Sequence, residues 1–73
     1  MPKDILFEIG DYLRKESQTR FKTNVEFATA CDVDEKTIRR IFLGEQNISI
    51  KVLEKICDAL EIKLSDLFLK INL

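Results

Sequence analysis

The side chains with the clearest chemical potential are long cations that fall close together in residues 35–43. In this segment Ile38 and Ile41 are spaced so that they share one face of a helix. At 100° per residue, Lys36 and Arg40 then lie on the opposite, outward face, one helical turn apart. Two long cations in this arrangement can bind the O6 and N7 atoms of guanine in the major groove of DNA.

The same cations also permit a simpler interpretation, in which they form a solvated helix surface. Glu35 and Arg39 stand four residues apart, and such a pair stabilises a helix by about 0.2–0.5 kcal/mol. Thr37 flanks the outward face, where its methyl group can contact a thymine. We favour contact with DNA because the cations occupy the face that the apolar residues leave bare.

Missing residue types exclude several other chemistries. The chain has no histidine, the commonest general base and zinc ligand. Cys31 and Cys57 lie far apart without a CxxC pair, which excludes a zinc finger. The two glycines cannot build a phosphate-binding loop. We therefore expect no enzyme, no cofactor and no metal, and we expect both cysteines to be core thiols, with a redox role as the alternative.

Length and composition predict one small domain spanning residues 1–73. The 45% of apolar residues is enough for a core and argues against disorder. No apolar run approaches the roughly 18 residues that a membrane helix needs, and the start of the chain does not resemble a secretory signal. We therefore expect no membrane association and a cytoplasmic location.

Apolar spacing and capping residues predict five helices and an all-α fold. The first begins near Lys3 and buries Ile5, Ile9, Tyr12 and Leu13, and the polar residues 15–22 are predicted to form a loop. Three further helices are placed by their N-caps, which are Thr23 (with Glu26 completing a capping box), Asp34 and Ser49. These helices cover residues 24–31, 35–43 with Gly44 at its end, and 50–60. A short helix follows around residues 65–70, although the alternation of Leu67, Leu69, Ile71 and Leu73 would also suit a strand.

Two stretches of this sequence resemble a known family. Residues 23–41 (TNVEFATACDVDEKTIRRI) resemble the helix-turn-helix of lambda-repressor-like DNA-binding proteins, also called the Cro/cI or XRE type. Residues 48–68 (ISIKVLEKICDALEIKLSDLF) resemble the fourth and fifth helices of that family. The resemblance implies a compact five-helix domain whose helix-turn-helix covers about residues 23–43.

The resemblance also implies which residues contact double-stranded DNA. The positions that contact bases in the family correspond here to Asn24, Glu35, Lys36, Thr37 and Arg40. Phosphate contacts are expected from Lys22, Thr23, Arg39, Asn47 and Ser49, the last with a helix N-terminus behind it.

Two departures from the family pattern matter for this site. Asp32 stands where relatives usually have the turn glycine, and aspartate tolerates the left-handed conformation better than most residues. Phe42 replaces an acidic residue that often pairs with an arginine of the first helix. We therefore expect Phe42 to join the core, and Arg14 to find another partner or solvent.

The charge balance is unusual for a protein that binds nucleic acid. The chain has a formal net charge of −1, with 12 Lys and Arg against 13 Asp and Glu. Residues 14–40 hold seven cations and five anions, so this part is mildly basic and the remainder is acidic. Few phosphates are then neutralised, which predicts weak non-specific affinity and a shallow dependence of binding on salt.

Surplus apolar residues point to a partner surface. The tail at residues 69–73 is denser in apolar side chains than a monomer usually tolerates, and we expect Leu69, Ile71 and Leu73, with Phe7, to form a homodimer interface. The alternative is that the tail covers its own core. The sequence thus favours a small transcriptional repressor that binds a palindromic site as a homodimer. The second hypothesis is a protein-interaction module of the same fold, such as an antitoxin that binds a partner protein.

Overall fold

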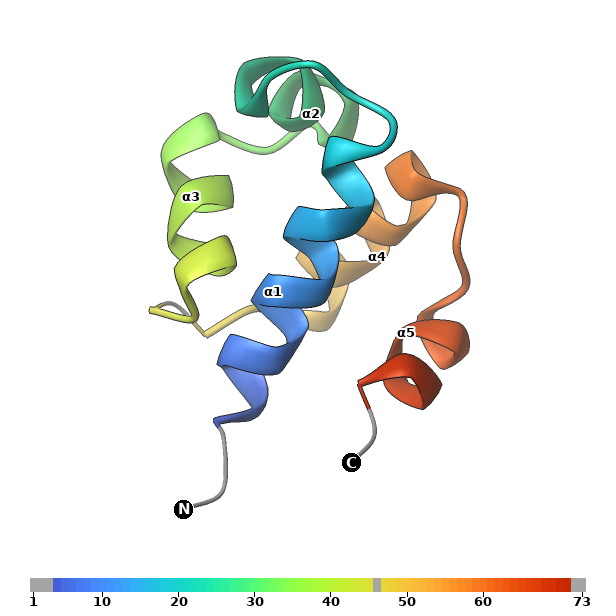
Figure 1. Cartoon of the computed structure of the whole chain (residues 1–73). Helices are drawn as coiled ribbons and strands as arrows, with labels where there is room; N and C mark the ends of the chain where they lie inside the picture. Colours follow the sequence, from blue (N-terminus) through green and yellow to red (C-terminus); the bar gives the residue numbers. More distant parts are fainter. Residues whose placement is uncertain (1–3, 46, 72–73) are drawn as a thin grey trace.

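The computed structural model describes residues 4–45 and 47–71, and every regular element in them is a helix. Figure 1 shows α1 crossing in front of α4, with α3 on one side and α5 on the other. The predicted all-α fold is confirmed. The elements are α1 (Ile5–Gln18), α2 (Asn24–Cys31), α3 (Glu35–Leu43), α4 (Ile50–Leu60) and α5 (Leu64–Lys70).

The three predicted N-caps are all present. Side-chain oxygens of Thr23, Asp34 and Ser49 accept hydrogen bonds from the backbone amides of Glu26, Lys36 and Val52, at 3.1, 3.2 and 3.2 Å. The second half of the capping box differs slightly from expectation, because the Glu26 carboxylate accepts from the amide of Lys22 (3.1 Å), one residue before the cap. Each bond satisfies an amide that the helix leaves without a partner.

Three helices end in the left-handed conformation. Asp32 (φ 57°) ends α2, as its tolerance of this region predicted, and Gly44 (φ 73°) ends α3. Glu61 (φ 58°) does the same for α4, which the sequence did not indicate. All three sites place two backbone amides on carbonyls of the last turn, so each helix stops at a defined residue.

The first helix is longer than predicted. The polar run that was expected to begin a loop at Lys15 remains helical as far as Gln18. Ser17 in this last turn is buried, and its hydroxyl donates to the carbonyl of Arg14 at 2.8 Å. Lysine, glutamate and glutamine are all good helix formers, so local preference supports the longer helix.

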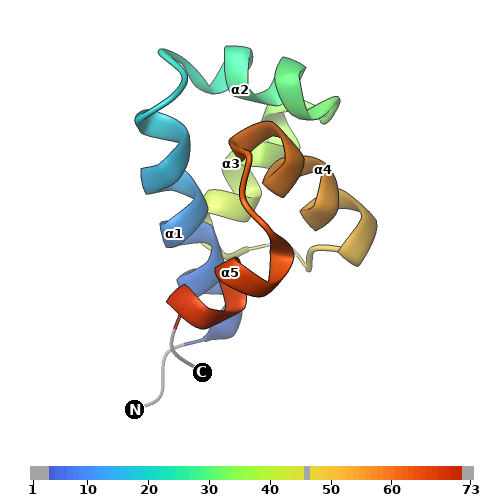
Figure 2. The same ribbon diagram turned by 90° about the vertical axis from the view of Figure 1, so that its right-hand side faces the viewer.

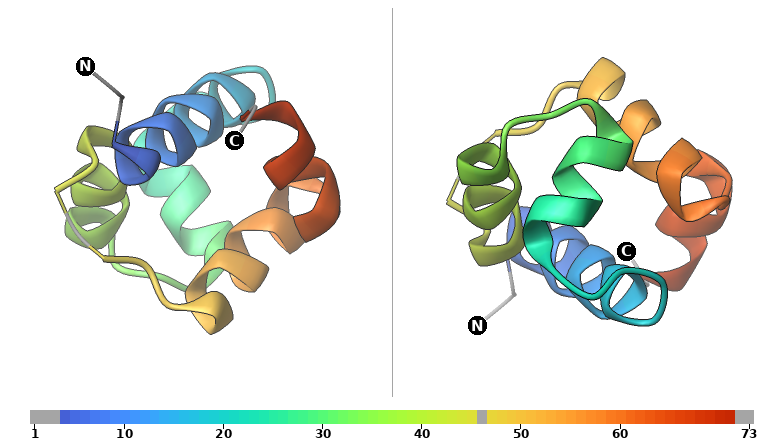
Figure 3. Two further views of the ribbon diagram at one scale, coloured as in Figure 1. Left: turned by 90° about the horizontal axis from the view of Figure 1, so that it is seen from below. Right: turned by 90° about the horizontal axis from the view of Figure 1, so that it is seen from above.

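One core joins all five helices. Phe27 of α2 is fully buried at its centre, with ring contacts to Phe21 at 5.3 Å and to Phe42 at 5.9 Å between centroids. Seen from below and from above, α1, α3, α4 and α5 surround this core and α2 lies across one end (Figure 3). The other fully buried side chains are Leu13, Cys31, Ile38, Leu53, Ile56, Cys57, Leu60 and Leu67.

Both cysteines are free thiols in the core, as predicted. Burial raises the pKa of the Cys31 thiol to about 11, and burial also raises that of Cys57. Because the thiolate is the reactive form, neither side chain is prepared for redox chemistry at neutral pH.

The end of the chain corrects one expectation. Ile71 is 6% exposed and packs in its own core, so its assignment to a dimer surface was wrong. The helical conformation of residues 64–70 also rules out the alternative strand. Figure 2 shows α5 turning back beside the first half of α1, and Ile71 lines a pocket together with Glu8 and Tyr12 of α1. Leu69 remains 77% exposed, and Leu73 lies outside the described residues.

Glycine permits a close backbone contact between α1 and α3. A methyl group at Gly10 would overlap the carbonyl oxygen of Ile41 and would lie 2.9 Å from that of Phe42. The left-handed Gly44 also lies close to α1, with only 2.8 Å between a Cβ there and the Cα of Phe7. The last turn of α3 is therefore held directly against the backbone of α1.

Candidate nucleic-acid interface

The outward face of α3 carries the two cations that the sequence singled out. Ile38 and Ile41 are buried against the core, which leaves Lys36 and Arg40 exposed on the other side of the helix. Neither cation has an ion pair within the part of the chain that the structure describes. Their charges are therefore available for an external partner.

The flank of this face is more constrained. The Glu35 carboxylate accepts a hydrogen bond from the Arg39 guanidinium at 3.0 Å, the pair that spacing allowed. Thr37 is half-buried beside them. Of the predicted base-contacting residues on α3, Lys36 and Arg40 are thus unpaired, and Glu35 is already engaged.

Three predicted residues lie at the start of α2. Lys22 and Thr23 are exposed, whereas Asn24, the first residue of the helix, is half-buried. The Glu26 carboxylate sits on the Lys22 amide, so one negative charge already stands at this helix N-terminus. This arrangement lowers the attraction of the N-terminus for a phosphate.

The start of α4 is better suited to an anion. Asn47 and Ser49 are exposed, and the first turn of the helix contains no acidic residue. The Ser49 oxygen accepts from Val52, which leaves its hydroxyl hydrogen available to donate. An α-helix N-terminus without a neighbouring carboxylate favours phosphate binding.

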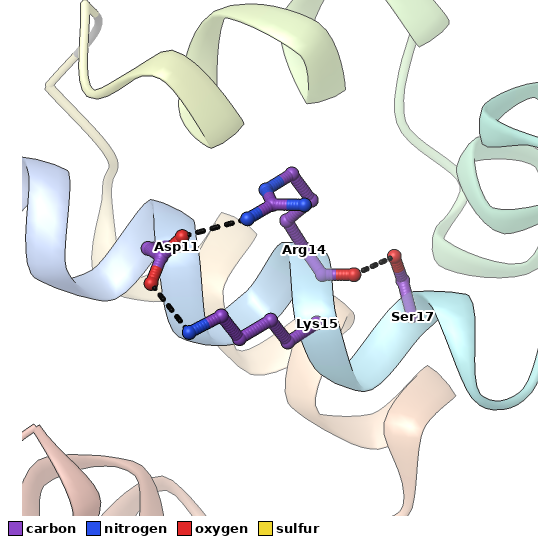
Figure 4. Close-up of polar contacts among 4 residues, drawn as sticks. All are labelled: Asp11, Arg14, Lys15 and Ser17. Carbon is purple, nitrogen blue, oxygen red and sulfur yellow. Dashed lines mark hydrogen bonds and ion pairs between the residues drawn. The ribbon is translucent and has the colours of Figure 1, made fainter.

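The structure also brings an unassigned residue to this surface. Arg14 of α1 lines an open cleft of about 230 Å³ together with Asn24, Arg39, Phe42 and Leu43. Figure 4 shows the Arg14 guanidinium extending toward α3, held by Asp11 at 2.8 Å. The spacing of Asp11 and Arg14 by three residues could have revealed this ion pair. The cleft itself depends on how α1 crosses α3, which no local pattern shows.

The Asp11 carboxylate orients two cations. Hydrogen bonds from Arg14 and then from Lys15 hold the pKa of Asp11 below its ordinary value of 3.8. Asp11 accepts from Lys15 at 3.2 Å, on the opposite side from Arg14 (Figure 4). Asp11 is thus the partner of Arg14, in place of the acidic residue that stands at the position of Phe42 in the resembling proteins. Phe42 is buried, as expected.

The remaining predicted residues are apolar. Phe7 is 47% exposed near the start of α1, and Leu69 is the most exposed large apolar side chain of the described residues.

No cluster of metal-ligating side chains is found in residues 4–45 and 47–71. No helix in the same residues has the length and apolar content to cross a membrane.

Comparison with known proteins identifies the family to which this arrangement of helices belongs. A family model described as helix-turn-helix matches residues 22–67, which cover α2 and α3, all of α4 and most of α5. No curated protein matches the chain significantly. The chain therefore belongs to the lambda-repressor-like, Cro/cI-type helix-turn-helix family, a family of DNA-binding domains rather than of enzymes.

Proposed function

We propose that this protein is a transcriptional repressor that binds a specific double-stranded DNA sequence in the cytoplasm. One observation supports it above the others: Lys36 and Arg40 are exposed and unpaired, one turn apart, on the face of α3 opposite its buried anchors. In a helix-turn-helix this face of the second helix enters the major groove. Lys36 and Arg40 bind guanine edges, and Thr37 contacts a thymine methyl group.

Neighbouring elements position α3 in the groove. Asn24 lies beside α3 at the start of α2 and contributes a base contact, while Lys22, Thr23 and Arg39 bind phosphates. Asn47 and Ser49 bind a further phosphate at the N-terminus of α4. Glu35 orients Arg39 through one carboxylate oxygen, and its second oxygen accepts a hydrogen bond from a cytosine amino group.

The repressor acts as a homodimer on a palindromic site. Leu69 at 77% and Phe7 at 47% exposure are the apolar side chains proposed for the interface, with Leu73. Two-fold pairing places two recognition helices about one DNA turn, roughly 34 Å, apart. Pairing also compensates for the net charge of −1 on each subunit, which gives only a weak electrostatic attraction to DNA, because two sets of base contacts then add.

A salt titration of duplex binding tests the DNA-binding function. Sites enriched from random duplexes are measured with the wild type at about 50 mM salt and above, where binding should weaken as salt rises. Lys36→Ala/Arg40→Ala should lower affinity at least about 30-fold, since each base contact contributes roughly 1–3 kcal/mol. Lys63→Ala/Lys70→Ala removes the same charge from the two ends of α5 and serves as the control.

The second candidate function is binding of a protein partner. The 77% exposure of Leu69 favours it, because covering this side chain with a partner protein would remove apolar surface from water. If no duplex binds at 50 mM salt, the DNA-binding function fails and this alternative replaces it.

A further inference from the structure

The cleft between α1 and α3 combines two kinds of surface. The cations Arg14 and Arg39 and the apolar side chains of Phe42 and Leu43 line it. Its volume is about 230 Å³, enough for a small chemical group. A lining of cations and apolar side chains suits a ligand that joins an anion to a hydrocarbon skeleton.

Both arginines are oriented in advance. A single nitrogen of Arg14 reaches Asp11 at 2.8 Å, and a single nitrogen of Arg39 reaches Glu35 at 3.0 Å. A guanidinium has five N–H donors, so each keeps further donors for a ligand. Because the carboxylates already hold the guanidinium groups in place, less side-chain entropy is lost when an anion binds.

The apolar part of the lining is accessible to a ligand. Leu43 is 62% exposed although it lies in the last turn of α3, and its neighbour Phe42 belongs to the core. An exposed leucine beside two guanidinium groups gains stability if another apolar surface covers it. Phosphate alone would not supply that surface, whereas the carbon atoms of a deoxyribose would.

The position of the cleft beside the proposed DNA interface indicates which ligand it binds. Asn24 at the start of α2 and Arg39 of α3 belong to the proposed DNA interface, and both line the cleft. In a helix-turn-helix the first helix of the pair crosses the DNA backbone while the second enters the groove. We propose that the cleft holds one sugar–phosphate unit of the DNA backbone. Arg14 and Arg39 bind its phosphate, and Leu43 packs on its deoxyribose.

This inference rests on the proposed function and extends it to α1, all of which lies before the matched residues 22–67. A phosphate contact from Arg14 fixes the angle at which α3 enters the groove but distinguishes no base. Arg14 should therefore contribute equally to binding of all duplexes, and the base contacts of α3 alone should rank them.

Replacing Arg14 gives the direct test. Arg14→Gln keeps a polar side chain but removes the charge and the guanidinium, and we expect it to bind every duplex about 5–10-fold more weakly, with the slope of log K against log salt reduced by about 1. The order of preference among sequences should not change. Arg20→Gln, which loses an exposed arginine paired with Glu61, is the matched control and should behave like the wild type. Thermal melting of each variant establishes that it is folded.

A scan of single methylphosphonate substitutions locates the contact. Each neutralises one backbone phosphate in the enriched duplex, and one position should weaken binding of the wild type clearly more than that of Arg14→Gln, which keeps only the Arg39 contact to that phosphate. If Arg14→Gln matches the wild type in affinity and salt slope while Lys36→Ala/Arg40→Ala loses binding, the inference is overturned and the proposed function stands. If the wild type binds no duplex at 50 mM salt, both fail.

Discussion

Helices α3 and α5 pack on the same core but are held in different ways. Helix α3 is capped by Asp34 at its start, ends at Gly44 with two backbone hydrogen bonds, and lies against α1 backbone to backbone. Helix α5 has only seven residues, no side-chain cap hydrogen bond, and one backbone bond at its end, Ile71. A helix this short depends on packing for its stability.

The exposed surfaces of the two helices differ as well. Helix α3 presents the cations Lys36 and Arg40, whereas α5 presents Leu69. Charge on a rigidly held helix suits a ligand of fixed geometry such as a DNA groove. An apolar side chain on a weakly held helix suits a protein surface that can adjust. The contrast therefore separates the proposed DNA face from the proposed dimer face.

The largest expected effect comes from breaking the junction between α1 and α3. In Gly10→Ala the added methyl group meets two backbone carbonyls that cannot move unless α3 moves. We expect the free energy of unfolding, measured by urea denaturation, to fall by about 3 kcal/mol. At an unconstrained helical site the same change would raise stability by about 1 kcal/mol, so an increase would show that the close contact does not exist.

Two substitutions near the end of the chain should differ sharply in their effects on stability and on self-association. Ile71→Ser removes a side chain that is 6% exposed and should cost about 3 kcal/mol of unfolding free energy. Leu69→Ser changes one that is 77% exposed and should alter stability by less than about 0.5 kcal/mol. Sedimentation equilibrium should show weaker self-association only for the second. If Leu69→Ser dimerises as strongly as the wild type, α5 is not part of the dimer interface.

Removing the N-cap of α3 and adding one to α5 should reduce the difference in stability between the first turns of these two helices. Asp34→Ala removes the acceptor for the Lys36 amide and should destabilise the domain by about 1 kcal/mol. Lys63→Ser supplies an acceptor at the uncapped start of α5 and should stabilise it by about 0.5 kcal/mol. Amide hydrogen exchange in the first turn of each helix measures both changes. Equal exchange in the two wild-type helices would contradict the proposed contrast.

The smallest expected effect is a change in the pKa of Asp11, the residue of α1 that pairs with Arg14. Because the Asp11 pKa is lowered from 3.8, its stabilising contribution is present above pH 3.8 and is lost as the pH falls through the lower, folded value. An NMR titration should show this lowered pKa in the wild type and a partial return toward 3.8 in Arg14→Gln. An unchanged pKa in the variant would mean that Arg14 does not reach Asp11 in solution.

Local chemistry explains which features could be predicted. The caps at Thr23, Asp34 and Ser49 and the burial of Ile38 and Ile41 follow from residue type and helical spacing, which act over a few residues. Asp32 was predicted for the same reason, since its tolerance of positive φ is intrinsic.

Features that depend on tertiary contacts were missed. Ile71 looked like surplus apolar surface because nothing nearby in the sequence shows that α5 turns back on α1. The last turn of α1 looked like a loop because its polar residues give no apolar period, although Ser17 is buried. The role of Arg14 was likewise invisible before α1, α2 and α3 were placed together.

Both glycines of the chain lie at the meeting of α1 and α3. The orientation of α3 is therefore set by main-chain atoms and by its buried side, and not by the residues that face outward. Lys36 and Arg40 could be exchanged for other side chains with little penalty in folding, while the target sequence would change. The domain thus has the properties of a scaffold on which new DNA specificities could evolve, or be engineered, by substitutions at a few outward positions.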